Sequence, residues 1–138
     1  MILGIEHLGI AVADGEASRR VFDRLLGKTS YKTENVTSEG VRTTFYEVGK
    51  SKLELLEDLA EDEKGIIWKY IERRGEGIHH IALAVDNIRQ EIARLKEEGF
   101  AFVNEVPKPG ADSKLICFLH PKSTNGVLVE LCQDRIDK

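Results

Sequence analysis

The sequence predicts an α+β fold in which two tandem βαβββ modules form a curved, barrel-like mixed sheet around a cavity, with the helices outside. Three observations support this class. A strand-like motif that begins with histidine occurs twice, at 7–14 and at 80–86. A segment with helical spacing of apolar residues follows each copy, and three short β-like segments follow each helix. The content of 41% hydrophobic and 32% charged residues is typical of a globular protein.

The repeat predicts the domain organisation. The run HLGIAVAD at 7–14 is repeated almost residue for residue by HIALAVD at 80–86. A repeated unit of this kind buries its apolar surface by packing beside its copy. A length of 138 residues suits one domain. We therefore expect a single domain, with module one at about 1–57, a linker helix within about 58–76 and module two at about 77–138.

In module one, the first strand leads into a helix over 16–26. Asp14 is the expected N-cap of this helix, and Gly27 is the residue that ends it. The β-like segments that follow lie near 29–36, 41–48 and 52–57.

In module two, the helix after the second strand has Asp86 as its expected N-cap and Gly99 as its end. The linker is expected to contain a short helix around 66–71 that ends at the turn 75–77. The β-like segments of this module lie near 101–106, 114–120 and 127–132.

Composition also excludes some classes of function. A net charge of −4 creates no global positive field for nucleic acid or an anionic membrane surface. The chain reaches Glu6 before a signal-peptide core forms, and no run approaches the roughly 20 apolar residues of a membrane span. We therefore expect a cytoplasmic protein. Cys117 and Cys132 lie in apolar runs without close paired spacing, which is typical of reduced, buried thiols.

Two histidines begin the repeated strands beside small residues. Because side chains alternate along a strand, His7 shares one face with Gly9 and Ala11, and His80 shares one with two alanines. Small neighbours leave room beside each imidazole, which indicates a cavity. The bulkier face of each strand is expected to pack on a helix.

A glutamate stands in the last strand of each module. Glu54 lies between two leucines, and Glu130 lies between a valine and a leucine. A carboxylate in an apolar strand needs a partner, because an unpaired buried charge is costly. A lone His or Glu on a strand is more often a hydrogen-bonded structural residue, but four at matched repeat positions favour a shared site. This N/O set suits a divalent metal, and we predict His7, Glu54, His80 and Glu130 as its ligands.

At these residues the chain resembles the vicinal oxygen chelate (glyoxalase) superfamily, whose paired modules hold one metal with ligands from the first and last strands of each module. More narrowly, it resembles the methylmalonyl-CoA epimerase family. The narrower resemblance spans about residues 4–132. It rests on IEHLGIAV at 5–12, LELLE at 53–57, GEGIHHIA at 75–82, FLHPKS at 118–123 and GVLVEL at 126–131.

The resemblance implies an isomerase that forms a homodimer. It also implies one bound divalent ion, with cobalt as the first candidate and zinc, nickel, manganese or magnesium as alternatives. The expected reaction interconverts the 2R and 2S epimers of methylmalonyl-CoA through a metal-stabilised enolate. Since C2 must exchange a proton on both faces, we expect Glu130 and Glu54 to act as base and acid. The chain departs from the family at Thr43, where a bacterial member has a Glu base, so the resemblance leaves the first base open.

An acyl-CoA thioester would need local contacts for its phosphates. Lys122, Ser123 and Lys114 are the predicted contacts, although ordinary surface residues would look the same. Two rival functions stay open: a glyoxalase-I-type lactoylglutathione lyase with a similar metal set, and a non-catalytic small-molecule-binding module of the same fold, in which the ligands would be lost. A ring-cleaving dioxygenase is disfavoured because its 2-His-1-carboxylate centre has fewer carboxylates.

Overall fold

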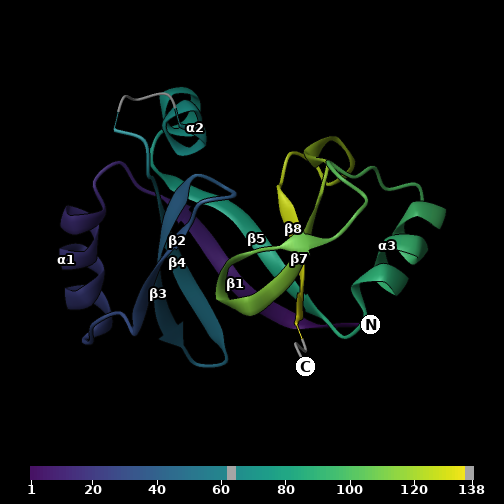
Figure 1. Ribbon diagram of the computed structural model, residues 1–138, viewed down its shortest axis with the longest axis horizontal. Coiled ribbons are helices and arrows are strands. Elements are labelled where there is room, and N and C mark those ends of the chain that lie inside the picture. Colours follow the sequence, from purple (N-terminus) through teal and green to yellow (C-terminus); the bar gives the residue numbers. More distant parts are fainter. Residues whose placement is uncertain (62–64, 136–138) are drawn as a thin grey trace. The chain divides into compact units, whose positions relative to one another are not determined.

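The computed structural model describes residues 1–61 and 65–135 (Figure 1). Residues 62–64 of the predicted linker and 136–138 of predicted module two lie outside the described residues. The elements in chain order are β1 (Ile2–Ala11), α1 (Gly15–Leu26), β2 (Lys32–Val36), β3 (Val41–Val48), β4 (Ser51–Asp58), α2 (Ile66–Arg74), β5 (Gly77–Val85), α3 (Ile88–Glu97), β6 (Lys108–Pro109), η1 (Ala111–Ser113), β7 (Lys114–Leu119), η2 (Pro121–Ser123) and β8 (Val129–Asp134).

These elements confirm the predicted α+β class. The chain divides into two compact units, one formed by residues 1–7 and 80–138 and the other by residues 8–79. Within 8–79 the strand order is β2-β3-β4-β1, and within the other unit it is β1-β5-β8-β7-β6. The sheet is mixed, since β5 and β8 pair in parallel while β3–β4 and β7–β8 are antiparallel. These units differ from the predicted modules, whose boundaries stay a prediction, as does the single domain.

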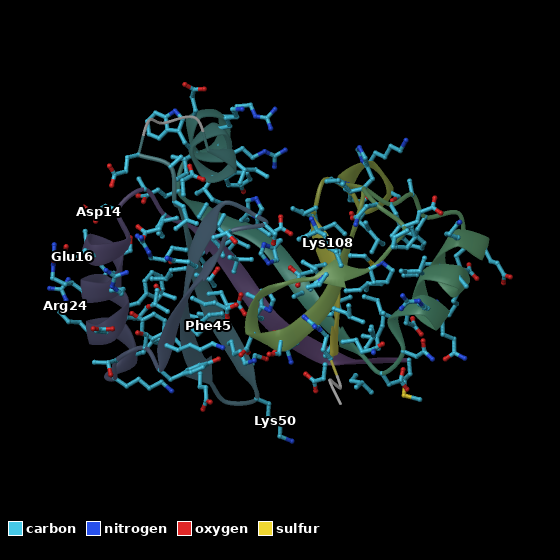
Figure 2. All side chains as sticks on the ribbon, viewed as in Figure 1. Asp14, Glu16, Arg24, Phe45, Lys50 and Lys108 are labelled. Atoms are coloured by element: carbon cyan, nitrogen blue, oxygen red, sulfur yellow. The ribbon has the colours of Figure 1, made fainter. Side chains whose placement is uncertain are left out.

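Helix α1 begins and ends where the sequence predicts. The side chain of Asp14 accepts a hydrogen bond from the backbone N–H of Ala17 at 3.1 Å, and Gly27 closes the helix in the left-handed conformation, with φ 70°. Figure 2 shows Asp14 and Glu16 at the start of α1 and Arg24 towards its end. This placement of charge complements the helix dipole.

The bulkier faces of the repeated strands pack on helices, as predicted. The β1 face that carries Ile10 and Val12 packs with α1, and the β5 face that carries Leu83 and Val85 packs with α3. The buried residues of the two clusters are Val12, Tyr46 and Leu55 in the first, and Val85, Ile88, Ile92, Leu95, Cys117, Leu119 and Leu131 in the second. Because side chains alternate, the histidine that begins each motif points from the opposite face.

Cys117 and Cys132 are both buried, and neither is in a disulfide. Burial raises the pKa of Cys117 to about 12, and the charge of Glu130 adds to this shift. The thiol is therefore protonated at neutral pH. Among the described residues, no helix has the length and apolar character that crossing a bilayer requires.

The strand predicted near 101–106 is wrong. The chain makes one isolated bridge there, and the strand beside β7 on the side away from β8 is the two-residue β6 at 108–109. Backbone hydrogen bonds join residues 101 and 103 to the end of β7. From Asn104 on, its side-chain amide donates to the carbonyl oxygen of Val106 at 3.0 Å, and a local turn replaces the strand ladder. Pro107 follows and has no N–H to donate to a neighbouring strand.

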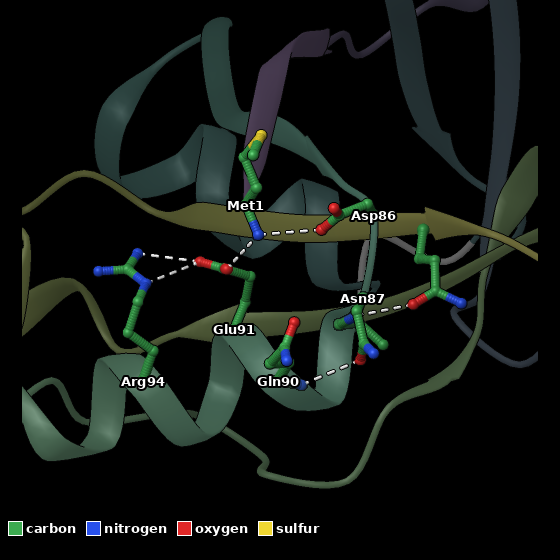
Figure 3. Close-up of polar contacts among 8 residues, drawn as sticks. Met1, Asp86, Asn87, Gln90, Glu91 and Arg94 are labelled. Carbon is green, nitrogen blue, oxygen red and sulfur yellow. Dashed lines mark hydrogen bonds and ion pairs between the residues drawn. The ribbon is translucent and has the colours of Figure 1, made fainter.

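The N-cap predicted for α3 is also wrong by one residue. The carboxamide oxygen of Asn87, not the carboxylate of Asp86, accepts the hydrogen bond from the Gln90 N–H, at 3.1 Å (Figure 3). Asp86 instead accepts from the α-ammonium group of Met1 at 2.9 Å. Local spacing predicts Asp86 as the cap, but Asp86 pairs with the ammonium group of Met1, which is far away in the sequence.

We predict that Asn87→Ala lowers the free energy of unfolding by about 1 kcal/mol, because it removes this cap. Asn87→Ser, which keeps a capping oxygen, is the matched control and should retain most of the stability. Urea unfolding of the three proteins measures the difference. Equal stability of the alanine variant and the unsubstituted protein would contradict the assignment.

Glu91 is a buried carboxylate in the same region, with a side chain 4% exposed. It pairs with the Met1 ammonium at 2.5 Å and with the Arg94 guanidinium at 2.9 Å (Figure 3). The hydrogen bond from the ammonium lowers the pKa of Glu91 most, and it raises the pKa of the ammonium group itself. Each partner therefore stabilises the charged form of the other.

These pKa shifts predict a pH window for stability. The lowered pKa of Glu91 makes its contribution complete above its ordinary pKa of 4.5, and this contribution is lost as the pH falls through the lowered value. The raised pKa of the ammonium makes its contribution complete below 8.0, and this one is lost as the pH rises through the raised value. Glu91→Gln should therefore lower the free energy of unfolding most between these two pH limits. It should also reduce the fall of that free energy at acid pH. Unfolding at several pH values measures both effects. Parallel pH profiles for both proteins would refute this.

Candidate metal centre

Three of the four predicted ligands lie together in the unit formed by residues 1–7 and 80–138. His7 comes from β1, His80 from β5 and Glu130 from β8, the strand that pairs in parallel with β5. The Nε2 atoms of the two histidines are 3.0 Å apart. Oε1 of Glu130 lies 3.1 Å from Nε2 of His80 and 3.7 Å from Nε2 of His7. The local parallel pairing thus brings one donor atom of each side chain to a common point.

The geometry of this group suits a divalent ion. Each of the three residues is only 5% exposed. Adjacent ligands bound at about 2.1 Å from a first-row metal lie about 3.0 Å apart in an octahedral arrangement, and two of the three spacings match that value. The His80 ring packs against Phe118 in a T-shaped arrangement, with ring centroids 5.8 Å apart, so an apolar ring borders the group. Two imidazole nitrogens and a carboxylate form a donor set for a first-row ion.

The charge state of Glu130 also suits such an ion. Burial by itself raises the pKa of Glu130, but hydrogen bonds from His7 and His80 together with their charges lower it to about 2. The side chain is therefore an ionised carboxylate at neutral pH. In this form it can bind a cation.

The other ring nitrogen of His7 faces a second carboxylate. Nδ1 of His7 lies 2.6 Å from Oε1 of Glu6. An ionised carboxylate can only accept a hydrogen bond, so Nδ1 carries the hydrogen. Nε2, the atom that faces His80 and Glu130, is then the nitrogen that would bind a metal, and the ion would displace the hydrogen that Nε2 donates to Glu130 in the metal-free site.

Glu54, the fourth predicted ligand, belongs to the unit of residues 8–79. It is 4% exposed and lies in β4 opposite Phe45 of β3. The leucines on either side of it occupy the face that packs with α1. Thr43, two residues before Phe45 and 1% exposed, shares the face of Glu54. The ligand and proton-transfer roles of Glu54 stay predictions.

The predicted CoA contacts make local interactions in the structure. The backbone N–H of Lys122 donates to Nδ1 of His120 at 3.1 Å, and the Ser123 hydroxyl donates to the carbonyl of His120 at 2.9 Å, so both residues build the η2 turn. The ammonium group of Lys114 pairs with Asp134 and lies 3.8 Å from Glu6. Contact of these residues with CoA stays a prediction.

The sequence interpretation overlooked Glu6 as a site residue. The repeat aligns Glu6 with His79, so the second copy has no acidic residue at this position. His79 packs against the ring of Tyr70, with centroids 4.7 Å apart. The available signal was an acidic residue directly before the first ligand histidine.

We predict that His80→Ala lowers the affinity for Co²⁺ by at least about a hundredfold, because it removes one of three converging donors. His120→Ala removes a histidine that caps η2 and is the matched control. Isothermal titration of the metal-free proteins with Co²⁺ measures both. Unchanged affinity in the His80 variant would show that the three donors do not form the site.

The chain is similar to several known proteins. The profile of the glyoxalase/bleomycin resistance protein/dioxygenase superfamily matches residues 6–118. The ethylmalonyl-CoA/methylmalonyl-CoA epimerase of Cereibacter sphaeroides is 38% identical over 135 residues, which are 96% of this chain and 99% of that protein. The human mitochondrial methylmalonyl-CoA epimerase is 36% identical over 94% of this chain and 73% of its own length. A solved structure of methylmalonyl-CoA epimerase in complex with methylmalonyl-CoA and NH4+ superposes with a TM-score of 0.88 at 30% identity, covering 99% of this chain and 97% of that chain.

Proposed function

The chain belongs to the glyoxalase/bleomycin resistance protein/dioxygenase superfamily, and we propose that within it this protein interconverts the 2R and 2S epimers of methylmalonyl-CoA. The relatives confirm the resemblance to methylmalonyl-CoA epimerases and the expected enzyme class, an isomerase. The observation that carries the proposal is the buried convergence of His7, His80 and Glu130. A non-catalytic binding module has no evident need for this group.

We propose that these three residues hold one divalent ion, with cobalt as the first candidate and Glu54 as the fourth ligand. When bound, the ion supplies Lewis acidity that stabilises negative charge on the substrate oxygens. The near-complete burial of the three donors supports this role, since electrostatic stabilisation is stronger where water is excluded. The support for Glu54 is its 4% exposure and its matched position in the repeat.

Proton transfer at C2 is assigned to the glutamates of the two repeats. Epimerisation removes the C2 proton from one face and returns a proton to the other, so a group is needed on each face. In the metal-free site Glu130 is ionised at neutral pH, which is the protonation state that a base requires, and binding of metal and substrate must raise its low pKa before it takes the proton efficiently. Glu54 is the corresponding carboxylate of the other repeat and completes the proposed pair.

The relatives support the proposed substrate class, and exposed apolar side chains support the proposed assembly. A related epimerase binds methylmalonyl-CoA, which supports an acyl-CoA thioester as the substrate here. Lys122, Ser123 and Lys114 are the proposed contacts to the CoA portion. The exposed apolar side chains of Leu3 and Ile5 on β1 support a homodimer. We further propose that the dimer works in the cytoplasm.

We expect the metal-loaded protein to exchange the C2 proton of methylmalonyl-CoA for deuterium in D₂O, and Glu130→Gln to reduce this exchange by at least about a hundredfold. Proton NMR of the substrate follows the exchange, and the metal content of each protein is measured in parallel. Full metal content together with full exchange in the variant would exclude Glu130 as base.

The rival enzymatic function is tested in the same samples. A glyoxalase-I-type enzyme would isomerise the hemithioacetal of methylglyoxal and glutathione, and we expect no such activity. Isomerisation of the hemithioacetal without C2 exchange in methylmalonyl-CoA would replace the proposed function with that rival.

A further inference from the structure

We infer that Glu6 and Lys114 form a charged pair that positions the His7 imidazole for metal binding, an inference that rests on the proposed metal centre. Both residues lie in the same compact unit as His7, His80 and Glu130. Neither is a donor of the converging group described above. Glu6 and Lys114 would affect metal binding by orienting the His7 ring, without binding the metal themselves.

The contact between Glu6 and His7 is short and largely buried. Oε1 of Glu6 lies 2.6 Å from Nδ1 of His7, and the two side chains are 12% and 6% exposed. A charge-assisted hydrogen bond of this length holds the ring in one orientation and one tautomer. It also increases electron density on Nε2, because a carboxylate that accepts from one imidazole nitrogen raises the basicity of the other. Glu6 therefore prepares the nitrogen that faces His80 and Glu130.

Lys114 meets the other oxygen of the same carboxylate. Its Nζ lies 3.8 Å from Oε2 of Glu6, and its side chain is 15% exposed. It also pairs with Asp134, the residue opposite it in the β7–β8 ladder, whose side chain is 81% exposed. Lys114 thus offsets the cost of a largely buried negative charge without competing for the oxygen that holds His7.

The repeat does not supply this carboxylate twice. The position that corresponds to Glu6 in the second copy holds His79, whose ring packs against Tyr70. His80 instead has the ring of Phe118 at its edge. A carboxylate directly before the ligand histidine is therefore specific to the first copy.

This assignment gives Lys114 a different role from the predicted contact to CoA, and the two roles have different consequences. A CoA contact would raise the KM for the acyl-CoA without changing metal affinity. A positioning role acts on the His7 ring and therefore on metal affinity, whether or not substrate is present.

The test uses two measurements on Glu6→Ala, Glu6→Gln and Lys114→Met. In the metal-free protein, nitrogen-15 NMR of the imidazoles reports the His7 tautomer. Competition with a chelator then gives the affinity for Co²⁺. Glu105→Gln, which changes an exposed glutamate that pairs with Lys96 in the same unit, is the control.

We expect the unsubstituted protein to hold His7 with hydrogen on Nδ1, and Glu6→Ala to lose this preference and to bind Co²⁺ about 10 to 100 times more weakly. Glu6→Gln keeps an acceptor oxygen and should show a smaller loss. It also keeps the test decisive if the alanine variant does not fold. Lys114→Met should weaken Co²⁺ binding, and the control should not.

An unchanged tautomer and unchanged Co²⁺ affinity in both Glu6 variants would overturn the inference. A Lys114→Met protein with a raised KM and normal Co²⁺ affinity would overturn the part assigned to Lys114 and favour the CoA contact. Failure of the unsubstituted protein to bind Co²⁺ would overturn the proposed function instead. The His7 tautomer, measured without metal, would then still decide whether Glu6 orients the ring.

Discussion

The candidate site depends on one constraint, the need to keep the carboxylate of Glu130 ionised while it is 5% exposed. Burial favours the neutral acid, and only close donors or cations reverse that preference. The imidazoles of His7 and His80 do so, at 3.7 and 3.1 Å. The donor geometry, the low pKa of Glu130 and the fit to a divalent ion all follow from this arrangement.

The same constraint explains how other acidic residues are used. Glu91 is even more buried, at 3% exposed, and the Met1 ammonium and Arg94 hold it, which gives it a role in stability. Glu6 is largely buried between His7 and Lys114, which links it to the metal centre. The difference lies in the partner. The ammonium and guanidinium partners of Glu91 only neutralise its charge, whereas the imidazole partner of Glu6 has a second nitrogen that can bind a ligand.

Sequence reasoning succeeded where the deciding interactions are local. Asp14 caps α1 because its hydrogen bond reaches only three residues ahead. It failed at Asp86, where the ammonium of Met1, 85 residues away in the chain, takes the carboxylate and Asn87 becomes the cap. It failed again at 101–106, where the Asn104 side chain competes with the strand ladder.

The sequence by itself determined the repeat, the α+β class and the histidine-bearing faces that point away from the helices, because these features depend on periodicity along the chain. Only the tertiary structure decided that donors of His7, His80 and Glu130 meet within 4.8 Å, and that Glu6 reaches the His7 ring with Lys114 behind it. Most of these contacts join residues far apart in the chain, and strand pairing with side-chain orientation sets their distances. Even the adjacent pair of Glu6 and His7 needs the folded strand to turn both side chains towards each other.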